Sequence, residues 1–111
     1  MLICNAFGGA VAKASPGATA FAHRGARFLA EFAAEWPAER ADPGVDAANR
    51  AWVRGLSDAV RPEMGQGSYL NYADAGMADW RRAYWGTNLA RLEAVKAAVD
   101  PGRVFGGKQV V

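Results

Sequence analysis

The chain has 111 residues, a length that suits one domain or part of one. Apolar residues make up 51% of it, which excludes a disordered composition, and its net charge of +2 comes from scattered, interleaved basic and acidic residues. That charge pattern argues against a nucleic-acid partner. No apolar run is long enough to span a membrane and no secretory signal is visible. The sequence therefore leaves the localisation open, with cytoplasmic as the default.

The first third of the chain predicts short strands and turns. Leu2–Cys4 is short and apolar, and Ala10–Lys13 and Ala18–Phe21 are further candidate strands. The pair Gly8-Gly9 permits positive φ values and predicts a turn, as does Ser15-Pro16-Gly17. The glycines do not predict a phosphate loop, because no Lys-Ser/Thr pair or G-x-G-x-x-G pattern accompanies them.

The segment Ala26–Trp36 fits two patterns. Phe28, Phe32 and Trp36 share an apolar face with helical spacing, and they share one with a period of two as well. Alanine, leucine and glutamate favour a helix intrinsically. Periodicity alone therefore leaves both a helix and a strand open.

A long helix is predicted after the loop that runs from Trp36 to Gly44. Asp42 is a typical N-cap, and Pro43 suits the first turn. The helix should run to about Arg61, because Pro62 is expected to end it. Its apolar stripe consists of Val45, Ala48, Trp52, Leu56 and Val60.

Two further helices are predicted in the C-terminal third. A short one stops at Gly86 and carries Met77, Trp80, Ala83 and Tyr84 on one face. Thr87 or Asn88 can cap the next, whose expected buried face is Leu89, Leu92, Val95 and Val99. Asp100-Pro101-Gly102 ends that helix, and Val104 and Phe105 are expected to pack back against it.

No conventional set of reactive groups is complete in this sequence. The single cysteine, Cys4, has no metal-ligand spacing around it and is expected to be a small buried apolar residue. The single histidine, His23, excludes a Ser-His-Asp triad and a histidine metal site within one chain. His23 beside Arg24 could bind an anion, but both are better explained as hydrogen-bonded structural groups at the start of a strand.

Ser68–Asp74 is the segment that bears on chemistry. If Ser68–Tyr72 is a strand, Tyr69 and Asn71 project to one face, about 6.6 Å apart along the chain. A phenol and a carboxamide at that spacing can meet one planar ligand at two points. Residue types alone favour the simpler interpretation, an amphipathic strand with a cross-strand aromatic contact.

The order of motifs resembles the C-terminal region of berberine-bridge-enzyme-like FAD-linked oxidases. Tyr69-Leu70-Asn71-Tyr72 with Asp74 resembles the family's YxNYxD signature, and Tyr84-Trp85-Gly86-Thr87-Asn88 resembles its YYGxN segment, with Trp85 in place of the second tyrosine. The resemblance covers nearly the whole chain. Its other matching positions are Gly8-Gly9-Ala10-Val11, Thr19-Ala20-Phe21, His23-Arg24, Arg91-Leu92, Val95-Lys96, Asp100-Pro101, Val104-Phe105 and Gln109.

The resemblance implies an α+β fold: a partial antiparallel sheet with covering helices, forming the C-terminal part of a larger two-domain flavoprotein. Ala26–Trp36 is then a strand. Residues 1–72 would supply strands and one helix of a substrate domain, and residues 73–111 would form a helical segment that returns to the FAD domain.

The resemblance also implies an oxidoreductase whose cofactor is FAD. A base removes a proton from an alcohol, sugar or secondary-metabolite substrate while hydride passes to the flavin, and O2 reoxidises the flavin. Tyr69 matches the tyrosine that serves as, or beside, the base, and Asn71 matches a residue near the flavin ring. Tyr72 and Asp74 are expected to brace the strand and its turn. No metal is implied.

A tyrosine base and a bound flavin both require groups that are not evident in this sequence. An ordinary tyrosine has a pKa near 10, so a tyrosine base needs a partner that stabilises its phenolate, and the sequence offers no evident one. The family's flavin anchors, a histidine and a cysteine, belong to an N-terminal FAD domain that is not in this chain, and Cys4 and His23 do not match them. The alternatives are an inactive fragment or a small self-associating α+β module without flavin.

Overall fold

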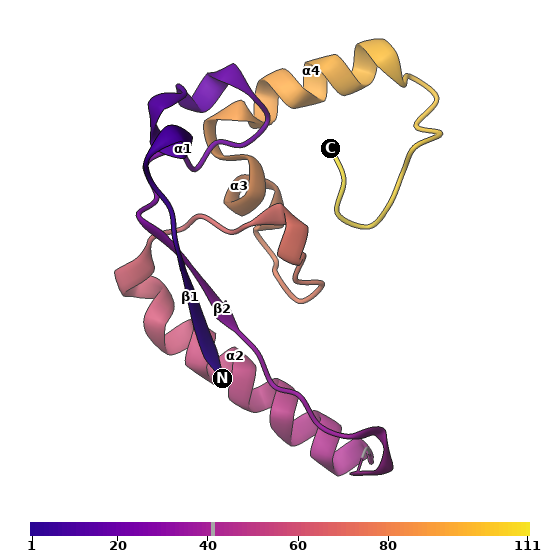
Figure 1. Cartoon of the computed structure of the whole chain (residues 1–111). Helices are drawn as coiled ribbons and strands as arrows, with labels where there is room; N and C mark the ends of the chain where they lie inside the picture. The colour runs from indigo at the N-terminus through magenta and orange to yellow at the C-terminus, as the bar shows by residue number, and fades with distance from the viewer. Residues whose placement is uncertain (41) are drawn as a thin grey trace. The chain divides into compact units, whose positions relative to one another are not determined.

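The computed structural model describes residues 1–40 and 42–111 (Figure 1). Residue 41 of the predicted loop lies outside this description. The chain forms two compact units, Met1–Ala6 with Phe28–Gln66 and Phe7–Arg27 with Gly67–Val111. Each unit therefore combines segments that are far apart in the sequence. The predicted division into residues 1–72 and 73–111 concerns a complete enzyme and stays a prediction.

The first unit contains an antiparallel pair of strands. β1 (Leu2–Ala6) pairs with β2 (Phe28–Phe32), with Leu2 opposite Phe32 and Ala6 opposite Phe28. The strand predicted within Ala26–Trp36 is confirmed, because β1 satisfies its backbone hydrogen bonds in a ladder. The antiparallel pair and the helices give the α+β class that was predicted.

The helix α2 (Pro43–Met64) packs beside β2 (Figure 1). Asp42 caps it as predicted, because its Oδ1 accepts hydrogen bonds from Gly44 N at 2.8 Å and Val45 N at 2.9 Å. Trp36 Nε1 donates to Asp46 Oδ1 at 2.9 Å, which ties the chain after β2 to the first turn of α2. These contacts fix the start of the helix within the first unit.

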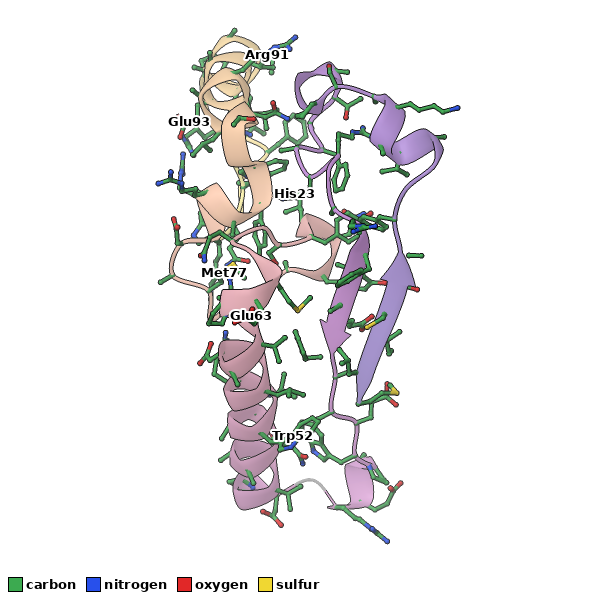
Figure 2. All side chains as sticks on the ribbon, turned by 90° about the vertical axis from the view of Figure 1, so that its left-hand side faces the viewer. His23, Trp52, Glu63, Met77, Arg91 and Glu93 are labelled. Atoms are coloured by element: carbon green, nitrogen blue, oxygen red, sulfur yellow. The ribbon has the colours of Figure 1, made fainter. Side chains whose placement is uncertain are left out.

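The end of α2 differs from the prediction. Pro62 lies inside the last turn, and the helix ends at Gly65, whose φ of 81° favours glycine. Proline removes only its own donor, so the residues after it can still complete one turn. The predicted apolar stripe is also only partly covered, since Trp52, labelled in Figure 2, is 50% exposed.

In the second unit, the N-terminal segment is helical and irregular instead of extended. Ala10–Lys13 is the short helix α1, Pro16–Ala18 is a 3-10 turn, and the described backbone of Ala18–Phe21 contains no strand. The strands predicted there were wrong, because neither segment meets a partner strand in the structure. The turn at Gly8-Gly9 is confirmed by φ values of 149° and 52°.

Four helical segments follow in the same unit. A 3-10 turn at Leu70–Tyr72 precedes α3 (Trp80–Trp85), a 3-10 turn at Gly86–Asn88 and α4 (Leu89–Val99). The strand predicted at Ser68–Tyr72 was wrong. The Ser68 amide bonds to Ala83 O of α3 at 2.9 Å, and the Tyr72 amide bonds to Tyr69 O within the turn at 3.0 Å, so both amides find partners without a strand ladder.

Few side chains of the described residues are buried. Among apolar residues only Ala83 and Tyr84 are, in α3. Val95, Val99, Val104 and Phe105 were expected to be covered, but they are exposed, Phe105 to 79%. Cys4 was expected to be buried and is exposed. The exposed apolar side chains of α4 and of the tail after it mark surface that this chain does not cover by itself.

Candidate functional site

Tyr69 and Asn71 lie together at the start of the Leu70–Tyr72 turn. Tyr69 is extended, with φ −93° and ψ 115°, and the chain then winds into the 3-10 turn. This brings the Asn71 side chain back onto Tyr69, so that Asn71 Nδ2 donates a hydrogen bond to the Tyr69 hydroxyl at 2.9 Å. The predicted pair is therefore brought together, although by a turn and not by a shared strand face.

Three aromatic rings surround the ring of Tyr69. Phe21, Phe7 and Tyr72 meet it with centroid distances of 5.9, 6.3 and 5.7 Å and interplanar angles of 86°, 87° and 67°. Edge-to-face contacts of this kind are worth about 0.5–1.5 kcal/mol each beyond the area they bury. They hold the ring of Tyr69 while Asn71 remains exposed beside its hydroxyl.

Phe7 and Phe21 are parts of the site that sequence reasoning missed. Their rings contact each other at 6.0 Å and reach Tyr69 from a segment about fifty residues earlier in the chain. Phe21 belongs to the Thr19-Ala20-Phe21 motif, which contributes to the family resemblance but does not indicate that Phe21 contacts Tyr69. Nothing in local periodicity indicates a pairing over that separation.

His23 and Arg24 both contact the Phe21 ring of this aromatic cluster. The Arg24 guanidinium lies 5.0 Å from the centroid of the Phe21 ring and donates to Thr19 Oγ1 at 2.5 Å and to Val11 O at 3.3 Å. The His23 ring lies edge-on to Phe21 at 5.7 Å. The prediction that both are hydrogen-bonded structural groups is confirmed, although β2 begins further along, at Phe28.

The position of His23 depends on close packing. Its Nε2 lies 3.1 Å from Tyr84 O, within hydrogen-bond distance. On another side, a Cβ atom placed on Gly67 would lie only 2.8 Å from its Nδ1. Gly67 is thus a position where the backbone approaches the ring too closely for any side chain. His23 is therefore packed between Tyr84 and Gly67 as a structural residue.

Tyr84 connects the turn after the site to the C-terminal tail. Its buried hydroxyl accepts from Asp74 N at 2.8 Å and donates to Gln109 Oε1 at 3.3 Å, and Gln109 Nε2 donates to Asp74 O at 2.8 Å. Asp74 Oδ1 also accepts from Gly76 N at 2.8 Å. The predicted bracing role of Asp74 is confirmed for the turn that follows Tyr72, and the tail returns to the same place.

Asn88 joins the two segments that build the second unit. It occupies the N-cap position of α4, but its side chain makes no capping bond. Its Nδ2 instead faces the carbonyl oxygens of Pro16, Thr19 and Ala20 at 2.8, 3.1 and 3.4 Å. The segment that carries Phe21 is thereby fastened to the α3–α4 corner.

The arrangement offers a phenol oxygen and a carboxamide side by side on an open turn. The phenol can give or take a proton, and the amide keeps its oxygen and one N–H for a ligand. Asn71 donates to the Tyr69 oxygen, so the structure provides a hydrogen-bond partner that was not evident from the sequence.

Other kinds of site find less support. In residues 1–40 and 42–111, no group of histidine, cysteine and carboxylate side chains is arranged to hold a metal ion, and no helix has the length and apolarity to cross a bilayer. A hollow of about 390 Å³ lies between the two last helices and the tail, and neither Tyr69 nor Asn71 lines it. The Tyr69–Asn71 pair remains the candidate site.

Part of this chain matches a known protein family. The family model for berberine and berberine-like proteins matches residues 68–111, which include Tyr69 and Asn71. No solved structure matches the chain.

Relatives extend the match to nearly the whole chain. It is 35% identical over 106 residues to the uncharacterized FAD-linked oxidoreductase YgaK of Bacillus subtilis, covering 96% of this chain and 22% of that protein. It is 35% identical over 107 residues to the chitooligosaccharide oxidase of Gibberella zeae (92% and 21%) and 31% identical over 117 residues to the aclacinomycin-N/aclacinomycin-A oxidase of Streptomyces galilaeus (89% and 21%). The chain thus spans about a fifth of the length of these relatives.

Proposed function

We propose that this chain, whose residues 68–111 belong to the berberine and berberine-like family and which is homologous to FAD-linked oxidoreductases, is the C-terminal portion of an FAD-dependent oxidase. Its substrate is an alcohol, a sugar or a secondary metabolite. An N-terminal FAD-binding domain completes the cofactor site, so this chain alone is expected to be inactive. The observation that carries the proposal is the hydrogen-bonded Tyr69–Asn71 pair within the matched segment.

Tyr69 is the proposed base. The substrate's O–H bond breaks and its proton passes to the Tyr69 oxygen, while the adjacent C–H bond breaks and its hydrogen leaves with the electron pair as hydride. FAD supplies the acceptor for that hydride, and O2 is the final oxidant. The aromatic rings around Tyr69 keep its oxygen aimed in one direction, because a base must lie within hydrogen-bond reach of the proton it removes.

Asn71 is the proposed contact to the flavin. Its side chain is exposed, and its oxygen and second N–H are free to meet the polar edge of a flavin ring. Cys4 and His23 have no role as flavin anchors in this proposal. His23 packs against Gly67 and Tyr84 in the second unit, and Cys4 lies on β1 in the first.

A flavin absorbance spectrum tests the proposal directly. The chain purified alone is expected to show no flavin band, and the chain purified with the FAD-binding domain is expected to show one that bleaches on adding substrate. In the complete enzyme, Tyr69→Phe should lower turnover by on the order of 10²-fold or more, the scale of general base catalysis. Trp52→Phe, an aromatic change on α2 of the first unit, is the control. An unchanged rate in Tyr69→Phe removes Tyr69 from the role of base.

A second candidate function is a self-associating module without flavin. The exposed apolar side chains of Val99, Val104 and Phe105 favour it, because an exposed apolar surface is typical of a protein–protein interface. The two functions differ in one readout. A chain that never acquires a flavin band with any FAD-binding domain, and that forms a defined oligomer alone, supports the module and contradicts the oxidase.

A further inference from the structure

We propose that Asn71 is a positioning residue that acts through Tyr69. Its amide nitrogen directs the phenol oxygen and stabilises negative charge on that oxygen when Tyr69 serves as the base. This inference rests on the proposed function and deepens it, because it gives Asn71 a task in proton transfer besides its contact with the flavin. It also supplies the phenolate partner that the sequence did not reveal.

The geometry supports a direct link between the two side chains. Asn71 Nδ2 lies 2.9 Å from the Tyr69 hydroxyl oxygen, an ordinary hydrogen-bond distance. The backbone bond from Tyr72 N to Tyr69 O, 3.0 Å long, closes the turn that places the amide there. Among the described residues, Asn71 is the one hydrogen-bond partner of that oxygen.

The Asn71 amide is the group beside the Tyr69 oxygen that can donate a hydrogen bond to it. Phe7 and Phe21 hold the ring of Tyr69 at its edges, but a phenylalanine has no donor to offer its oxygen. A phenolate accepts hydrogen bonds and cannot donate one. Of the two polar atoms of the amide only the nitrogen can serve it, and the nitrogen is the atom that faces Tyr69.

The environment in the complete enzyme strengthens the effect. In this chain the pair is open to water, which weakens the bond by competition. When a flavin and a second domain cover it, the local dielectric falls and a donor to a charged oxygen gains in weight. The amide's second N–H and its oxygen stay available to the flavin, so both tasks of Asn71 are compatible.

A double-mutant cycle in the complete FAD-loaded enzyme tests the inference. The variants are Tyr69→Phe, Asn71→Ala and the two combined. Asn71→Ala should lower kcat about tenfold, the scale of one hydrogen bond to a charged group, with little change in KM. In the Tyr69→Phe background the same change should have a much smaller effect, limited to what the contact with the flavin contributes. Independent, multiplicative effects overturn the inference. If Tyr69→Phe alone leaves turnover unchanged, the result contradicts the proposed role of Tyr69 as the base, whatever Asn71 does.

A second readout does not depend on activity. In this chain, labelled at the tyrosine 13Cζ atoms, Asn71→Asp should shift the Tyr69 signal, because an ionised carboxylate of nearly the same shape cannot donate to the phenol. The Tyr84 signal, which reports on a separate hydrogen-bond pair, should stay in place. A Tyr69 signal that does not respond to Asn71→Asp shows that the two groups do not interact in solution, and it overturns the inference.

Discussion

Lys96 Nζ lies 2.5 Å from Asp100 Oδ2 at the C-terminal end of α4. The same carboxylate accepts from Val104 N at 2.8 Å and from Phe105 N at 3.1 Å, and Lys96 Nζ also donates to Phe105 O at 2.5 Å. One ion pair thus fixes the turn that carries two exposed apolar side chains. The hydrogen bond from Lys96, and then those from the two amides, hold the pKa of Asp100 below its ordinary value against the opposing effect of desolvation.

A pH dependence of stability follows from this shift. A carboxyl whose pKa is lower in the folded state favours folding above its ordinary value of 3.8, and it loses that contribution as the pH falls through the folded value. We expect urea midpoints measured from about pH 6 to about pH 2.5 to fall at the acid end, and less so in Asp100→Asn. Asp79→Asn, at the start of α3, is the control. Identical acid profiles for the protein and Asp100→Asn would falsify the assignment.

Tyr84→Phe should destabilise the second unit. The change deletes a buried hydroxyl that accepts from Asp74 N and donates to Gln109 Oε1, while the buried aromatic ring is retained. We expect a loss of about 1–2 kcal/mol in the free energy of unfolding, measured by urea titration. Tyr72→Phe removes a hydroxyl from a ring that is 54% exposed, so it should stay within about 0.5 kcal/mol. Equal losses in the two variants would contradict the role of Tyr84.

Asn88→Ala should weaken the attachment between the two segments of the second unit. It removes the donor that faces the carbonyls of Pro16, Thr19 and Ala20, at a cost of about 1–3 kcal/mol. Asn88→Asp should cost more, because it points carboxylate oxygens at carbonyl oxygens. Hydrogen exchange should rise in residues 16–20 in both variants and remain unchanged in the control Thr87→Ala. Unaltered exchange in that segment would show that Asn88 does not hold it.

The chain alone should self-associate. Val99, Val104 and Phe105 are each at least 75% exposed and lie on α4 or just after it, where little else covers them. Size-exclusion chromatography with light scattering should detect species larger than a monomer at micromolar concentration, and Val104→Ser with Phe105→Ser should raise the monomer share. Lys108→Ser serves as the control. A stable wild-type monomer rules the prediction out.

Local signals in the sequence predicted local structure well. The Asp42-Pro43 pair marks the start of α2, and Gly86 ends α3 with φ 51° because these residues act on backbone groups next to them. Ser68–Tyr72 was predicted less well, since a strand requires a partner from elsewhere in the chain and periodicity carries no information about one. A turn formed in its place.

The candidate site was predicted in part. Tyr69 and Asn71 do lie together, but the expected strand would have separated them by two residues' length, whereas the turn brings them into contact. Phe7 and Phe21 could not be found from spacing, because their contact with Tyr69 depends on how the two segments of the second unit fold together. The expected burial of Val95 and Val99 was wrong because helical periodicity identifies an apolar face but not the surface that covers it.

The family match begins at residue 68, yet the rings of Phe7 and Phe21 contact Tyr69 from outside the matched range. The border of the family model and the border of the packed unit therefore differ in this molecule. Anyone exchanging this region between relatives, to transplant a substrate preference for example, should move residues 7–27 together with residues 67–111. A graft limited to the matched stretch would carry Tyr69 into its new host without the rings that contact it.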